Sequence, residues 1–233
     1  MLPTAPSLHS ARRVRLQALR GRVGLGLVAG LSVLAGMTDA VGLLALGDFV
    51  SFMSGNTTRL AVAISQADLA LILRLALAIL GFVLGNTLGV LLARRLNRRA
   101  APLLLIVATL LAFAAAWPAS ITFPALIAAT LAMGMLNAVV EQVNGLPIGL
   151  TYVTGALSRF GRGLGRWLLG ERRDGWRVQL VPWSGMLLGA ALGAWLQQRL
   201  GLQALAASCA LACLLALVTV FIPRAWQLGY MPR

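Results

Sequence analysis

The sequence contains no lysine, a single histidine and only six acidic residues among 233 residues. The histidine, His9, lies in an N-terminal tail with proline and serine, which excludes a histidine-based catalytic or metal site. The two cysteines, Cys209 and Cys213, lie four residues apart in an apolar run, as packing residues of a membrane helix often do. No nucleophile–base pair is visible either. We therefore expect no enzyme, no metal site and no cofactor.

Apolar residues make up 59% of the chain, whereas soluble domains contain about 45–50%. Several apolar runs approach or exceed the roughly 20 residues that a helix needs to cross a bilayer. They predict an all-α membrane protein, with the lipid bilayer as its partner, a basic tail at 1–22, one membrane domain at 23–222 and a second tail at 223–233. The expected transmembrane helices lie at about 23–46, 69–93, 101–117, 121–140, 178–196 and 202–222.

The net charge of +14 comes from 20 arginines, which cluster in short segments between the apolar runs. This placement argues against nucleic-acid binding and is typical of residues that orient a membrane protein. If both termini are cytoplasmic and the chain crosses six times, all arginines except Arg59, Arg74 and Arg199 face the cytoplasm. We therefore expect this topology in the cytoplasmic (inner) membrane of a bacterium.

The chain contains a tandem repeat with an offset of about 100 residues. SFMSGNTTRL at 51–60 matches TYVTGALSRF at 151–160, and GMTDAV at 36–41 matches GMLNAV at 134–139. A glycine-rich helix at 81–96 matches 185–200 at eight of sixteen positions. The predicted repeats are 23–117 and 121–222. Three spans in each repeat would place them in opposite orientations, an arrangement common in secondary transporters.

The ten-residue stretches at 51–60 and 151–160 are rich in hydroxyl groups and follow long apolar runs. A full crossing at 51–65 would move the arginines at 94–99 outside, so we expect a re-entrant or interfacial segment, or the broken end of the preceding helix. Gly55 and Gly155 can break a helix, and the N-terminus of a restarted helix attracts anions. The residues predicted to bind a small polar solute, with anions among the candidates, are Asp39, Ser51, Ser54, Gly55, Asn56, Thr57, Arg59, Asn137, Thr151, Tyr152, Thr154, Gly155, Ser158 and Arg159.

Each of these residues also has a purely structural interpretation. Serine and threonine in membrane helices often bond their own backbone, glycine often only packs, and arginine can reach the interface with its long side chain. Asp39 is either a proton or cation relay or a structural hydrogen-bonding group. The sequence thus predicts a transporter or permease, with a non-transporting membrane scaffold or assembly partner as the alternative.

Two blocks resemble the signature of the YoaK-like family of bacterial membrane proteins, which is domain of unknown function 1275. They are GMTDAVGLLALGDFVSFMSGNTTRLAV, from residue 36, and GMLNAV followed by TYVTGALSRFG, from residues 134 and 151. The family's second motif usually reads TGxLT, and here it ends in Ser158. The resemblance covers nearly all of residues 23–222. It implies a six-helix inner-membrane protein of a family sometimes labelled as permeases, and it implies no substrate.

Overall fold

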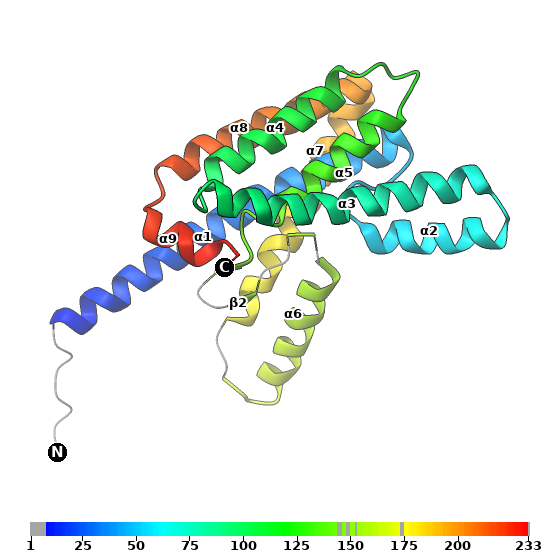
Figure 1. Cartoon of the computed structure of the whole chain (residues 1–233). Helices are drawn as coiled ribbons and strands as arrows, with labels where there is room; N and C mark the ends of the chain where they lie inside the picture. Colours follow the sequence, from blue (N-terminus) through cyan, green and yellow to red (C-terminus); the bar gives the residue numbers. More distant parts are fainter. Residues whose placement is uncertain (1–7, 144–145, 148–149, 152, 173–174, 233) are drawn as a thin grey trace.

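A computed structural model describes residues 8–143, 146–147, 150–151, 153–172 and 175–232. The regular structure of the described residues is helical apart from one short antiparallel strand pair, β1 (Gln142–Val143) and β2 (Leu146–Pro147) (Figure 1). The helices are α1 (Leu8–Val41), the π-helical turn η1 (Gly42–Leu46), α2 (Met53–Ser65), α3 (Leu69–Arg95), α4 (Ala100–Ala116), α5 (Phe123–Leu136), α6 (Val153–Leu168), the 3-10 turn η2 (Trp176–Gln179), α7 (Leu180–Leu200), the 3-10 turn η3 (Gly201–Ala204), α8 (Leu205–Val220) and α9 (Arg224–Tyr230).

Three helical stretches of the described chain are long and apolar enough to cross a membrane: Arg15–Leu46, Leu69–Arg95 and Trp176–Val220. The last of these is 45 residues long, and Gly201 divides it into α7 and α8. The φ of Gly201 is +59°, which other residues rarely adopt. The apolar helices α4 and α5 are shorter, with 17 and 14 residues. The expectation of an all-α membrane protein is therefore confirmed, and each predicted apolar run overlaps a helix.

The first helix begins earlier than hydropathy predicts. It starts at Leu8, inside the predicted tail, because residues 8–20 contain no proline or glycine and are mostly good helix formers such as arginine, leucine and alanine. It ends in the π-helical turn η1, and Gly47 follows in a left-handed conformation with a φ of +82°. The fourth run ends earlier than predicted, since α5 stops at Leu136 and a turn follows.

Glycines bring two pairs of helices into backbone contact. A Cβ atom at Gly36 in α1 would overlap the carbonyl oxygen of Met186 in α7, and one at Gly189 in α7 would overlap that of Val33 in α1. In the second pair, a Cβ at Gly85 in α3 would overlap the carbonyl oxygen of Leu131 in α5. Small residues at such positions let helices approach closely without side chains between them. Each pair thus joins a helix of the first repeat to a helix of the second.

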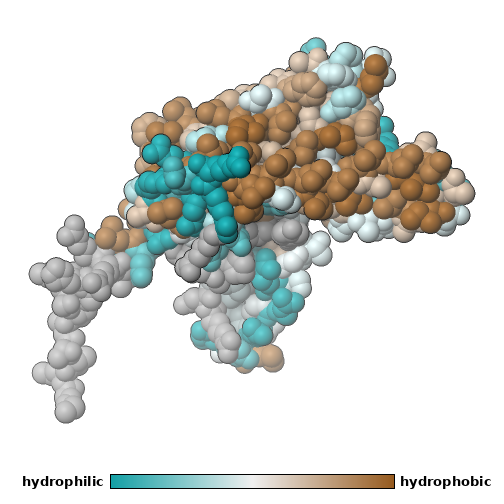
Figure 2. Space-filling view, in the orientation of Figure 1, coloured by the Kyte–Doolittle hydropathy of each residue, from teal (hydrophilic) through white to brown (hydrophobic). Residues whose placement is uncertain are grey.

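The remaining apolar helices complete the bundle. α4 packs against α8, and both lie beside the two glycine-bound pairs (Figure 1). The visible surface over α2, α3 and α4 is largely apolar (Figure 2), with exposed side chains such as Val62, Leu73 and Leu105. A hydrophilic patch lies where α3 ends and α4 begins, at the exposed arginines Arg94, Arg95 and Arg99. The apolar surface fits contact with lipid, and the arginines fit the border with water.

Candidate functional site

The two repeated stretches meet at one cavity. α2 and α6 begin near the middle of the molecule and run from there in different directions (Figure 1). Between their N-termini lies a cavity of about 290 Å³, which we call the central cavity. Its lining comes from the turn before α2 and the start of α2, from the residues around the start of α6, and from α3: Ser51, Phe52, Met53, Ser54, Thr151, Val153, Thr154, Gly155 and Phe82.

Asp39 holds the turn that leads into α2. One oxygen of its carboxylate, Oδ1, accepts hydrogen bonds from the backbone N–H groups of Val50 (2.8 Å), Ser51 (2.7 Å) and Phe52 (3.4 Å). The side chain is only 5% exposed. Hydrogen bonds to a carboxylate are stronger than those to a neutral group, and three of them on one oxygen fix the backbone beside the central cavity. This geometry favours the structural interpretation of Asp39 over a relay.

Asn137 has a related role in the second half of the chain. Its Oδ1 accepts a hydrogen bond from the Oγ1 hydroxyl of Thr151 at 3.3 Å, and its Nδ2 donates to the carbonyl oxygen of Met133. Thr151 is the counterpart of Ser51 in the repeat, just as Asn137 is the counterpart of Asp39. In both halves, therefore, a polar residue from the preceding helical segment bonds to the same position of the repeated stretch.

Asn56 also stabilises the turn before α2, through the backbone of Phe49. Its Nδ2 donates to the carbonyl oxygen of Phe49 at 2.6 Å, and its Oδ1 accepts from the N–H of the same residue at 3.3 Å. The Asn56 side chain is fully buried and does not line the central cavity. Asn56 is thus a structural residue that fixes the loop.

Ser51 is the most deeply buried hydroxyl-bearing residue of the central cavity. The residue is 2% exposed and lines the central cavity. Its Oγ lies near the Asp39 carboxyl group but makes no well-formed hydrogen bond within the described part of the chain. The hydroxyl is therefore enclosed beside the Asp39 carboxyl group rather than exposed to the cavity. The hydroxyl-bearing residues Ser54, Thr151 and Thr154 line the same space.

Arg59 lies outside the lining of the central cavity. Its Nη1 contacts Oδ1 of Asp48 at 2.7 Å and the carbonyl oxygen of Gly47 at 2.9 Å. The other carboxylate oxygen of Asp48 accepts from Nε of Arg74, so one carboxylate that is 1% exposed joins α2 and α3. The carboxylate partner of Arg59 is thus Asp48 and not Asp39, whose Oδ1 accepts from backbone N–H groups instead. The sequence signal for Asp48 was its place beside Gly47 at the end of an apolar run.

Arg159 lies closer to the central cavity. Its Nε donates to Oε1 of Gln179 at 2.9 Å, and this is the hydrogen bond that its guanidinium makes within the described chain. Its Nη1 lies 3.6 Å from the position that a Cβ atom at Gly155 would occupy. Arg159 is not among the described residues that line the cavity, but its charged end lies close to Gly155, which is one of them.

The other predicted residues lie in or near the first turns of α2 and α6. The hydroxyl of Thr57 donates to the carbonyl oxygen of Met53 in its own helix, and the hydroxyl of Ser158 accepts from Arg162. Gly55 and Gly155 lie inside the first turns of α2 and α6, so the expectation that they break a helix was wrong. In the first half the break lies upstream, at Gly47. Tyr152 lies outside the described residues.

Comparisons with known proteins agree with a membrane protein. Residues 27–218 match the family described as "Protein of unknown function (DUF1275)". The chain is also 53% identical over 218 residues to the UPF0700 transmembrane protein RA0705 of Rhizobium meliloti (strain 1021), a match that covers 93% of this chain and 95% of that protein. No solved structure matches the chain. The resemblance inferred from the two signature blocks is therefore confirmed.

Proposed function

The chain belongs to the DUF1275 family of membrane proteins, and we propose that it moves a small polar solute across the bacterial cytoplasmic membrane through the central cavity. The observation that carries this proposal is the meeting of the two repeated stretches at one cavity. A scaffold would need no such space, and solid packing between α2 and α6 would serve it better.

We also propose that the six apolar helices α1, α3, α4, α5, α7 and α8 cross the membrane as two inverted repeats. The packing supports this arrangement, because α1 lies against α7 as α5 lies against α3, and α4 lies against α8. Exchanging the two repeats leaves this set of contacts unchanged. In transporters with inverted repeats, binding sites lie at the interface of the repeats near the middle of the bilayer, and the central cavity fits that position.

The chemistry of the central cavity favours an anion or a carboxylate as the solute. The N-terminus of a helix carries partial positive charge, and two helices, α2 and α6, begin at the cavity. Arg159 adds a full positive charge close to Gly155, and the described residues that line the cavity include no acidic residue. The exposed hydroxyls of Ser54 and Thr154, which line the cavity, are suitable donors for a carboxylate oxygen.

A cavity-filling variant tests the proposal. Purified protein in liposomes is assayed for uptake of radiolabelled formate, acetate and lactate, with glycerol as a neutral solute. Gly155→Leu should lower uptake at least tenfold, because Gly155 lines the central cavity and an added Cβ there would meet only the Arg159 side chain, at 3.6 Å. Gly161 lies on the same helix, and no atom lies within 4 Å of the position that a Cβ would occupy there. Gly161→Leu is therefore the matched control and should transport normally.

A charge variant tests whether the solute is an anion. Arg159→Gln should reduce uptake of carboxylates more than uptake of glycerol, whereas Arg162→Gln, one turn further along α6, should have little effect. Equal uptake by Gly155→Leu and wild type would contradict transport through this cavity. Absence of uptake of every solute by the folded wild-type protein would favour the scaffold.

A further inference from the structure

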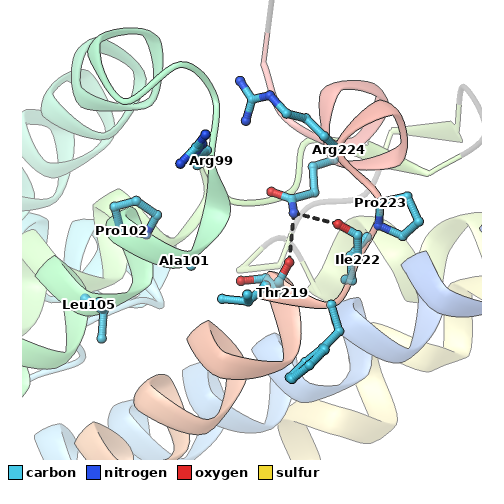
Figure 3. Close-up of a pocket in the computed structure, with 11 residues that line it drawn as sticks. Arg99, Ala101, Pro102, Leu105, Thr219, Ile222, Pro223 and Arg224 are labelled. Atoms are coloured by element: carbon cyan, nitrogen blue, oxygen red, sulfur yellow. Dashed lines mark hydrogen bonds between the residues drawn. The ribbon is translucent and has the colours of Figure 1, made fainter.

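A second pocket lies far along the chain from the residues of the central cavity. It has a volume of about 500 Å³ and is formed where α4 begins, α8 ends and α9 begins (Figure 3). We call it the arginine pocket. Its lining residues are Arg99, Ala101, Pro102, Leu105, Thr219, Val220, Phe221, Ile222, Pro223, Arg224 and Gln227.

Two arginines provide the charged part of the arginine pocket. Arg99 precedes α4 by one residue, and Arg224 is the first residue of α9. Arg224 donates through Nη2 to the carbonyl oxygen of Asn97, which places its guanidinium at the turn that carries Arg99. The guanidinium of Arg99 makes no hydrogen bond within the described residues. The described residues that line the pocket include no acidic side chain to pair with these two charges.

One wall of the pocket is apolar and open to the outside of the bundle. Leu105 is 51% exposed, Val220 is 64% exposed and Phe221 is 79% exposed. Leu105 lies on α4 beyond Pro102, on the side away from the arginines (Figure 3). Because α4 and α8 are apolar helices, we expect these side chains to face the hydrocarbon part of the bilayer. The pocket therefore combines a cationic end at the border with water and an apolar wall that continues into lipid.

Polar groups of the pocket floor are already satisfied. The buried Gln227 donates through Nε2 to the carbonyl oxygens of Thr219 (2.8 Å) and Ile222 (2.9 Å), as drawn in Figure 3. Its Oε1 accepts from the N–H of Ala100 at 3.2 Å. This side chain joins the ends of α4, α8 and α9, so the pocket keeps its shape without a ligand. A polar solute would find few free partners here apart from the two guanidinium groups.

We propose that the arginine pocket binds one anionic phospholipid, with the phosphate between Arg99 and Arg224 and an acyl chain along Leu105 and Phe221. Basic pockets between membrane helices on the cytoplasmic side are suited to anionic head groups, and the apolar wall supplies the place for the chain. This site is separate from the central cavity and does not depend on transport.

Native mass spectrometry of the full chain in an uncharged detergent measures the binding of added phosphatidylglycerol and of phosphatidylcholine with the same acyl chains. The wild type should bind phosphatidylglycerol more tightly than phosphatidylcholine. Arg99→Gln should weaken its binding about fivefold, and Arg99→Gln with Arg224→Gln about thirtyfold, as expected for loss of one and two interfacial charges. Arg224→Lys should bind nearly as the wild type does. The thermal unfolding temperature of each variant shows that it is folded.

Two controls can overturn the proposal. Arg95→Gln removes an exposed arginine that does not line the pocket, and a loss as large as that of Arg99→Gln would mean diffuse attraction to the basic patch. Inorganic phosphate and glycerol phosphate should compete weakly, since they lack the acyl chain. Full displacement of phosphatidylglycerol by millimolar inorganic phosphate would instead identify a phosphate site. Leu105→Ser, which shortens the apolar wall, should weaken lipid binding without changing competition by phosphate.

Discussion

Asp39 and Asn137 occupy matching positions and carry different charges. Asp39 accepts three backbone hydrogen bonds on one carboxylate oxygen, whereas the Asn137 side chain accepts one from the hydroxyl of Thr151. The charged residue therefore binds main-chain N–H groups, and the neutral residue binds a side-chain hydroxyl. Asp39 fixes the main chain before α2, and Asn137 orients a single side chain of the stretch before α6.

This difference predicts unequal effects of substitution. Asp39→Asn keeps an acceptor oxygen but loses the charge, and bonds to charged groups contribute about 1.5–3 kcal/mol. We expect it to lower the free energy of unfolding by about 2 kcal/mol. Asn137→Ala removes weaker neutral bonds and should cost about 1 kcal/mol. Denaturant titration in mixed micelles measures both values, and a larger loss for Asn137→Ala would contradict the role assigned to Asp39.

The sequence predicted a polar requirement at these positions but not the partners. A repeated motif shows that Asp39 and Asn137 belong to equivalent places, yet it does not specify which atoms lie opposite. The partners of Asp39 are backbone N–H groups, which have no signature in the sequence. The Asp48–Arg74 pair, separated by 26 residues, likewise depends on the return of α3 beside α2.

At the scale of the helix, glycines decide which elements touch. Their spacing of four residues predicted ridges that a second helix can approach. The partner helices were not predictable, because a ridge of small residues accepts any helix of suitable shape. The structure pairs the ridge of α3 with α5 and the ridge of α7 with α1. Hydropathy also located the apolar helices well but missed the early start of α1, since helix-forming arginines extend it beyond the apolar run.

Enlarging a ridge glycine by one methyl group should already be harmful. The Cβ of Gly85→Ala would overlap the carbonyl oxygen of Leu131, and that of Gly189→Ala the carbonyl oxygen of Val33. Overpacking typically costs about 1–3 kcal/mol, and we expect each variant to fall at the upper end because backbone must move. At Gly26 in α1, no atom lies within 4 Å of the position that a Cβ would occupy. Gly26→Ala should therefore be neutral or stabilising by up to about 1 kcal/mol. Thermal unfolding in detergent compares the three, and unchanged stability of both ridge variants would show that the helices are not in backbone contact.

At the scale of the whole molecule, the arginines predict the orientation. We expect the turn between α4 and α5 to lie outside the cell and the turn between α3 and α4 to lie in the cytoplasm. In a Cys209→Ser/Cys213→Ser background, an impermeant thiol reagent added to intact cells should label Ala119→Cys and not Asn97→Cys. Permeabilised cells should allow labelling of both. Labelling of Asn97→Cys alone in intact cells would show the reverse topology. Equal labelling of both positions would exclude the expected topology.

Because helices of the first repeat pack on helices of the second, their pairing during synthesis is delayed. When the ribosome has completed α1, the helix that fits against its glycine is still absent, because α7 ends 159 residues later, at Leu200. At about 5–20 residues per second, this interval lasts roughly 8–30 s. During that time Gly36 faces lipid or a temporary companion. α3 finds its partner α5 early, but α1 must wait for the last third of the chain, which makes this interval the point at which an insertion chaperone would have most effect.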